Sequence, residues 1–159
     1  MKINFAITSP EGALLNEEQA QEALAAGHSP TDEDELELSG WLLIRHEGQP
    51  NLDFNDDLSM LMPNCPGVAA SLRTTGRAEL RMASYYCHLL FIAEGESIQV
   101  QQTDGTHAGE IVARYPKEGF LEALTACVER FRAYAAALAQ LDARWTSLHA
   151  DLVEPATQA

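Results

Sequence analysis

The sequence is poor in cysteine, and its few cysteines are not arranged in pairs. Cys65, Cys87 and Cys127 are far apart and odd in number, which excludes the disulfide framework of a small secreted domain. Cys87 and Cys127 also fall on apolar patterns, where a free thiol packs as a small hydrophobic side chain. These features predict a reducing compartment, and we expect a cytoplasmic protein.

Long hydrophobic runs are missing as well. No apolar stretch has the length needed to cross a bilayer. The first segment, residues 1–8, alternates apolar and polar residues and lacks the long apolar core and the small-residue cleavage site of a signal peptide. We expect this segment to form a half-buried first β-strand.

Signatures of catalysis and of cofactor binding are also lacking. Neither of the two lysines follows the glycine-rich turn of a P-loop, and there is no dinucleotide-binding fingerprint. Cysteine and histidine do not occur at the short spacing of a structural zinc site, and the acidic run lacks the pattern of a calcium loop. A cysteine–histidine nucleophile would have to be assembled in space. The candidate residues are Cys65, Cys87, His46 and His107. We therefore expect no catalytic residue, no metal site and no cofactor, and hence no enzyme.

Basic residues are scarce, at ten against twenty-four acidic ones. Arg73, Arg77 and Arg81 form the only basic cluster, which is too small for phosphate binding by a chain of net charge −14. We expect these arginines to pair with nearby carboxylates. The negative field argues against nucleic acid and anionic membranes as partners.

What the sequence has in excess is acid near its N-terminal end. Residues 1–57 contain thirteen carboxylates against Lys2 and Arg45, so this stretch carries about −11 of the net charge of −14. Such asymmetry bears on partners and association rates, and not on the fold. The acidic surface either attracts a basic protein or only keeps the chain solvated. The carboxylates that we expect to contact a partner are Asp32, Glu33, Asp34, Glu35, Asp53, Asp56 and Asp57.

The length of 159 residues predicts a single α+β domain over residues 1–154, followed by a frayed tail over residues 155–159. After the first strand, the patterns predict a short helix, a second strand and two short helical turns. Their ranges are 16–26 with Asn16 as the N-cap, 35–45, 56–62 and 66–72. Pro66 stands at an allowed first-turn position of the last of these.

An antiparallel meander and a long helix are predicted for the remainder of the chain. The four strands of the meander are expected at 78–84, 86–93, 97–102 and 110–115, with glycine turns at 94–96 and 104–106. The helix is expected over 116–152, with apolar residues repeating every seven positions from Leu124 to Leu152. This stripe either covers the meander or forms a coiled-coil seam for dimerisation, and the first reading supplies the cover that the sheet needs. The predicted fold is thus an antiparallel sheet of about five to six strands against a long C-terminal helix, with short N-terminal helices.

The layout of the chain carries a resemblance to a known class. The acidic N-terminal part is followed by a strand with Gly40-Trp41, a meander around residues 86–100, and a closing strand at 111–117 that leads into a helix at 120–134. In this layout the chain resembles the small acidic immunity proteins of type VI and contact-dependent interbacterial toxin systems. The resemblance implies a cytoplasmic protein that binds one cognate toxin and occludes its active site. A toxin that acts on nucleic acid has a basic cleft, which an acidic inhibitor can fill.

Type III secretion chaperones are the alternative class. They are also small, acidic α+β proteins, and they bind an effector segment as homodimers. The segment 53–58, Asp-Phe-Asn-Asp-Asp-Leu, is similar to their acidic-aromatic stretches. Their first element is normally an amphipathic helix, whereas residues 1–8 alternate like a strand. A catalytic housekeeping domain is the third and least favoured interpretation.

Overall fold

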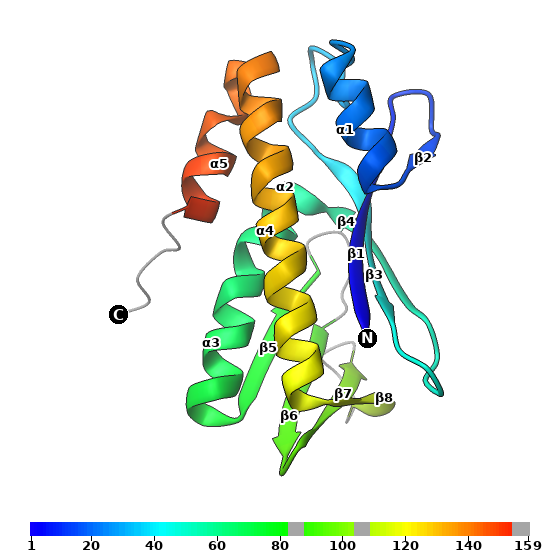
Figure 1. The fold of residues 1–159 in the computed structure, drawn as a ribbon, viewed down its shortest axis with the longest axis vertical. Helices are drawn as coiled ribbons and strands as arrows, with labels where there is room; N and C mark the ends of the chain where they lie inside the picture. Colours follow the sequence, from blue (N-terminus) through cyan, green and yellow to red (C-terminus); the bar gives the residue numbers. More distant parts are fainter. Residues whose placement is uncertain (83–87, 104–108, 154–159) are drawn as a thin grey trace.

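The computed structural model describes residues 1–82, 88–103 and 109–153. These residues form an α+β fold with two four-stranded antiparallel sheets and a long helix that runs along both (Figure 1). Sheet A has the strand order β2-β1-β3-β4, with β1 Lys2–Thr8, β2 Leu14–Leu15, β3 Ser39–Arg45 and β4 Leu52–Asp57. Sheet B has the order β5-β6-β7-β8, with β5 Arg77–Arg81, β6 His88–Glu94, β7 Ser97–Thr103 and β8 Glu110–Pro116.

Five α-helices and two short 3₁₀ turns connect and cover these strands in the described ranges. The helices are α1 Glu17–Ala25, α2 Leu58–Leu61, α3 Cys65–Thr75, α4 Lys117–Leu141 and α5 Thr146–Val153. The 3₁₀ turns are η1 Met62–Asn64 and η2 Ala143–Trp145. Within the described part of the chain, no helix combines the length and the apolar character that a membrane crossing requires.

The expected first strand and first helix are both confirmed. β1 buries Ile3, Phe5 and Ile7 on one face, as its alternation predicts. α1 starts after the predicted cap: the Asn16 side chain accepts a hydrogen bond from the Gln19 N–H at 2.9 Å, and the Gln19 side chain accepts one from the Asn16 N–H at 3.0 Å. This reciprocal pair is a capping box, which satisfies two backbone donors at the start of the helix.

The meander is confirmed as sheet B, in which neighbours in sequence are neighbours in space. Gly95 has φ of 61° in the turn between β6 and β7, in agreement with the predicted 94–96 turn. β5 ends at Arg81, and β6 begins at His88. Residues 83–84 and 86–87, which the sequence assigns to the ends of these two strands, lie outside the described residues. The expected 104–106 turn and the 155–159 tail also lie outside them.

The single sheet of five to six strands that the sequence predicts is instead divided into two sheets. β1 pairs with β3 and β2 and not with the meander, so it becomes a central strand of sheet A. α4 then covers both sheets. Near its start, the Phe120 ring lies 5.2 Å from that of Phe91 in sheet B; further along, the Phe131 ring lies 5.1 Å from that of Phe5 in sheet A. Buried residues of both sheets join in one hydrophobic cluster.

The long helix is shorter than the predicted 116–152. α4 ends at Leu141, because Asp142 takes an extended conformation with φ of −141° and ψ of 105°. Its carboxylate accepts a hydrogen bond from the Arg144 N–H at 3.1 Å and starts η2, after which α5 packs back beside α4 (Figure 1). The residues of the seven-residue repeat are buried within the chain, which confirms the core interpretation of the stripe: Leu124, Phe131, Leu138, Trp145 and Leu152.

β4 is the one described strand of four or more residues for which the sequence predicts no strand. Its sequence contains three aspartates and one asparagine, residue types that are depleted in strands. Its pairing is decided by tertiary contact, since Leu52 lies opposite Ile44 and Phe54 lies opposite Leu42. The helical turn expected at 56–62 is α2 with η1, and the turn expected at 66–72 is part of α3, which has Pro66 in its first turn.

Candidate protein-binding surface

An acidic loop leads from α1 into β3. Its residues 32–37 are all exposed, and they lie between the buried Thr31 and the buried Leu38. We call residues 32–37 the acidic loop. Four of the predicted partner-binding residues lie here: Asp32, Glu33, Asp34 and Glu35. Among the described residues, no side chain forms an ion pair with any of these four carboxylates.

Arg144 fixes the acidic loop to the C-terminal end of α4. Its guanidinium donates to the backbone carbonyl of Glu33 and, at 3.3 Å, to that of Asp32. The same guanidinium forms an ion pair with the Asp142 carboxylate at 2.7 Å. The hydrogen bonds that Arg144 donates to this carboxylate hold the pKa of Asp142 below its ordinary value. The loop is thereby held through its backbone, while its carboxylates remain exposed.

Leu36 lies within this acidic loop and is 62% exposed. The sequence predicts it as part of a strand over 35–45, but β3 begins only at Ser39. At Leu38 the regular ladder stops, because the Leu38 N–H donates to the Asp57 side chain at 3.0 Å and not to a strand carbonyl, although the Leu58 N–H still donates to the Leu38 carbonyl at 2.8 Å. The sequence pattern therefore did not predict that Leu36 is an exposed apolar side chain surrounded by carboxylates.

Asp53 lies apart from the acidic loop. It stands on the edge strand β4, opposite Leu43, and its carboxylate pairs with the Arg45 guanidinium at 2.5 Å. Ser39, the first residue of β3 after the loop, lies opposite Asp57. A strand rises about 3.3 Å per residue, so Asp53 lies about 13 Å along the sheet from Ser39. It is a peripheral member of the acidic surface.

Asp56 and Asp57 have roles within the fold. Asp56 is only 1% exposed, and its carboxylate accepts the Asp57 N–H at 2.8 Å. Asp57 caps α2 by accepting the Ser59 N–H at 3.0 Å and the Ser59 hydroxyl at 2.6 Å, in addition to the Leu38 N–H. The structure thus gathers four of the seven predicted residues on one exposed loop, and the prediction that Asp56 and Asp57 contact a partner remains untested.

Asp57→Ala is expected to destabilise the protein by about 1–3 kcal/mol, because it leaves a helix cap and the Leu38 N–H without their acceptor. Asp53→Ala is the matched control, since it removes an aspartate of the same strand that takes part only in an exposed ion pair. That change is expected to cost about 0–1 kcal/mol. Urea unfolding of the two variants measures the difference, and equal losses would contradict the capping role of Asp57.

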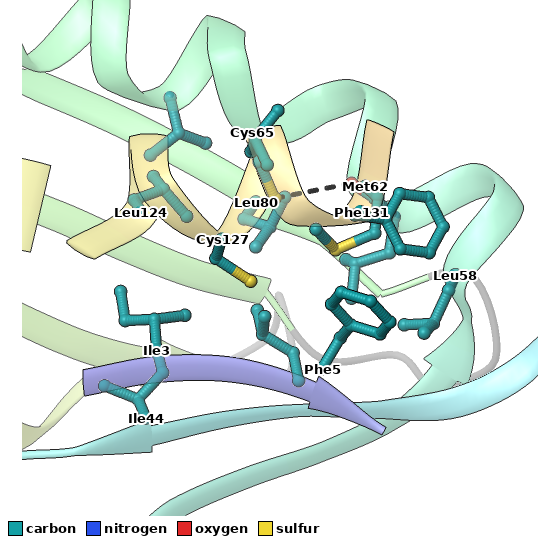
Figure 2. Packing of buried hydrophobic residues seen from close by; sticks show 14 of the residues in the cluster. Ile3, Phe5, Ile44, Leu58, Met62, Cys65, Leu80, Leu124, Cys127 and Phe131 are labelled. Atoms are coloured by element: carbon teal, nitrogen blue, oxygen red, sulfur yellow. Dashed lines mark hydrogen bonds between the residues drawn. The ribbon is translucent and has the colours of Figure 1, made fainter. Parts of the chain in front are cut away.

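Two of the three cysteines are core residues. Cys65 on α3 and Cys127 on α4 point into the packed interior, and Cys127 faces β1 (Figure 2). The Cys65 thiol donates to the Leu61 carbonyl at 3.6 Å. Burial raises the pKa of Cys127 to about 12 and raises that of Cys65 above its ordinary value as well, so neither supplies a thiolate near neutral pH. Cys87 and His107 lie outside the described residues.

The arginine cluster is only partly paired. Arg81 lies 3.5 Å from the Glu79 carboxylate, which also receives a hydrogen bond of 2.5 Å from His88 Nδ1. The hydrogen bond from His88 is the main reason that the pKa of Glu79 is lowered, and Arg81 adds to it. For Arg73 and Arg77, the described part of the chain offers no ion pair. The predicted pairing is thus confirmed for Arg81 alone.

The described residues contain no group of three or more histidine, cysteine or acidic side chains placed to hold a metal ion. His46 lies with its ring edge-on to Tyr115, with a centroid distance of 6.1 Å. The candidate site is therefore a surface, formed by the acidic loop with Leu36. Comparison with known protein families, with curated proteins and with solved structures finds no match to this chain.

Proposed function

We propose that this protein is a cytoplasmic immunity protein that binds a cognate secreted antibacterial toxin one to one and occludes its active site. The toxin has a basic cleft of the kind that acts on nucleic acid. The acidic loop meets this cleft through Asp32, Glu33, Asp34 and Glu35. No catalytic step, metal or cofactor is assigned to the protein itself, and no nucleic acid or membrane is assigned as its partner.

The observation that carries the proposal is the exposed Leu36 among carboxylates on a loop that Arg144 holds in place. Protein interfaces combine an apolar core with a polar rim, and Leu36 among its carboxylates has this arrangement. Exposed carboxylates that no ion pair neutralises increase the rate of encounter with a positive cleft. A backbone that is held before binding also loses less conformational entropy when the complex forms.

The secretion-chaperone alternative receives less support. In that class an amphipathic helix normally comes first, whereas residues 2–8 here form β1, a central strand of sheet A. The stretch 53–58 that is similar to chaperone sequences consists of the edge strand β4 and the start of α2. Asp56 and Asp57 in this stretch take part in internal hydrogen bonds.

The test begins with candidate toxin domains from neighbouring genes, each co-expressed with this protein and then purified for association kinetics. Reversing Asp32, Glu33, Asp34 and Glu35 to lysine is expected to slow association severalfold or more and to flatten its salt dependence. The matched control reverses four exposed glutamates elsewhere and changes the net charge equally: Glu96, Glu110, Glu118 and Glu122. The control is expected to change the rate much less.

Leu36→Ala provides the second arm of this test. If Leu36 is buried by the toxin, its truncation is expected to raise the dissociation rate and to cost about 1.5–3 kcal/mol of binding free energy. The proposal fails if the protein does not neutralise the toxin. It also fails if the loop reversal and the control reversal slow association to the same extent, because the acid would then act only through net charge.

A further inference from the structure

A groove opens beside the acidic loop, between the β1–β2 hairpin and α1. Its volume is about 460 Å³, within the range of about 300–1,000 Å³ that ligand pockets occupy. One wall is the hairpin with Ile7, Pro10 and Leu15; the opposite wall is α1 with Ala20 and Ala23. We call this the hairpin groove.

The remaining sides of the hairpin groove connect it to the core and to the acidic loop. Tyr134 of α4 lines it and is itself only 1% exposed. His28, Ser29 and Pro30 close the third side, and the chain continues from them through Thr31 into the acidic loop. Figure 1 shows the hairpin, α1 and this loop together at one end of the molecule.

Both walls are fixed by hydrogen bonds, so the groove exists before any partner arrives. In the hairpin turn, the Ser9 N–H donates to the Ala13 carbonyl at 2.8 Å and the Ala13 N–H donates to the Ser9 hydroxyl at 3.0 Å. At the end of α1, the His28 N–H donates to the Ala23 carbonyl at 2.9 Å. A pre-formed groove avoids part of the ordering cost of binding.

The charged side chain that lines the hairpin groove is acidic. This residue, Glu11, is exposed and has no ion pair with another described residue. Among the described residues, no lysine or arginine lines the groove. The acidic loop begins two residues after Pro30, which lines the third side. Leu14 on the hairpin adds an apolar side chain that is 56% exposed.

We propose that the hairpin groove receives a large apolar side chain from a segment of the partner protein in which lysine or arginine flanks that side chain. The apolar walls bury the side chain, Glu11 pairs with a basic neighbour, and the adjacent acidic loop attracts the segment as a whole. This inference rests on the proposed function in one respect, because it takes the partner to be a basic protein. The hairpin groove is then a second contact point in addition to Leu36, and the segment that fills it is both apolar and basic.

Three labelled hexapeptides test this inference without knowledge of the toxin. The first, Lys-Arg-Trp-Leu-Arg-Lys, combines apolar and basic residues; Lys-Arg-Ser-Gly-Arg-Lys lacks the apolar pair, and Glu-Glu-Trp-Leu-Glu-Glu has the opposite charge. The first is expected to bind the whole protein at least about tenfold more tightly than either control, measured by fluorescence anisotropy. Its amide shifts in ¹⁵N NMR spectra are expected to cluster on the hairpin, α1 and residues 28–30.

Two variants locate the binding. Ala23→Trp fills the groove and is expected to weaken binding of the first peptide about tenfold or more, whereas Ala126→Trp on an exposed position of α4 leaves it unchanged. Should Ala23→Trp fail to fold, the single change Glu11→Arg replaces an exposed side chain that lines the groove. It is expected to weaken binding severalfold and to reduce its salt dependence.

Several results would overturn the inference. They are equal affinity for the first two peptides, tight binding of the acidic peptide, amide shifts away from the groove, or no binding at millimolar peptide. A dimer of this chain that Ala23→Trp abolishes would assign the groove to a second copy and would also overturn it. Failure here is separable from failure of the proposed function, because toxin neutralisation and the acidic-loop kinetics do not involve these peptides.

Discussion

Phe131→Ala is expected to lower the free energy of unfolding by about 3–5 kcal/mol. The ring is fully buried at the centre of α4 and contacts the Phe5 ring edge-on at 5.1 Å and the Tyr134 ring at 6.0 Å. Its removal leaves a cavity between α4 and sheet A, which the surrounding side chains can fill only in part (Figure 2). Urea or guanidinium unfolding followed by circular dichroism gives the value.

Glu122→Ala on the same helix is the control for Phe131→Ala. Glu122 is exposed and forms no ion pair with another described residue, so its truncation is expected to change stability by less than about 0.5 kcal/mol. A loss below about 1 kcal/mol for Phe131→Ala, in a protein that is still folded and monomeric, would contradict a core position for the ring.

Gly40→Ala is expected to destabilise the protein by about 3 kcal/mol or more, although it adds a single methyl group. A Cβ atom at Gly40 would lie 2.4 Å from the Ala6 carbonyl oxygen and 2.6 Å from Leu58 Cδ1. The Leu58 side chain could move, but the Ala6 carbonyl belongs to β1, which is paired on both sides in sheet A. Relief of this clash therefore requires β1 and β3 to shift against each other.

Ser39→Ala, one residue earlier in β3, serves as the comparison for Gly40→Ala, because it changes a half-buried side chain and adds no atom against β1. It is expected to cost less than about 1 kcal/mol. Thermal unfolding of both variants provides the measurement. If Gly40→Ala were as stable as Ser39→Ala, the close approach of β1, β3 and α2 at this point would be wrong.

The class-level fold could be predicted because its signals are local. The capping box at Asn16, the alternation of Ile3, Phe5 and Ile7, and the glycine turn between β6 and β7 are each specified by a few neighbouring residues. The change from alternating to helical periodicity near Pro116 likewise marks the boundary between β8 and α4. These local predictions agree with the structure because the tertiary contacts favour the same local conformations.

Strand pairing could not be predicted in the same way. Whether β1 joins the meander or pairs with β3 depends on which long-range pairing buries more apolar surface, and residue patterns alone do not specify this choice. The aspartate-rich β4 forms a strand only because Leu52 and Phe54 pair across to β3. The end of α4 at Leu141 similarly depends on Asp142, whose carboxylate starts η2.

The candidate surface also has some features that the sequence predicts and others that depend on tertiary contacts. The sequence by itself determined that acid is concentrated in residues 1–57 and that no local motif for catalysis is present. Only the tertiary structure decided which carboxylates are exposed on one loop, because Asp56 and Asp57 take part in hydrogen bonds at the β4–α2 corner while residues 32–35 stay exposed. Arg144, more than a hundred residues further along the chain, holds the acidic loop in place, and contacts of that separation leave no pattern in a sequence.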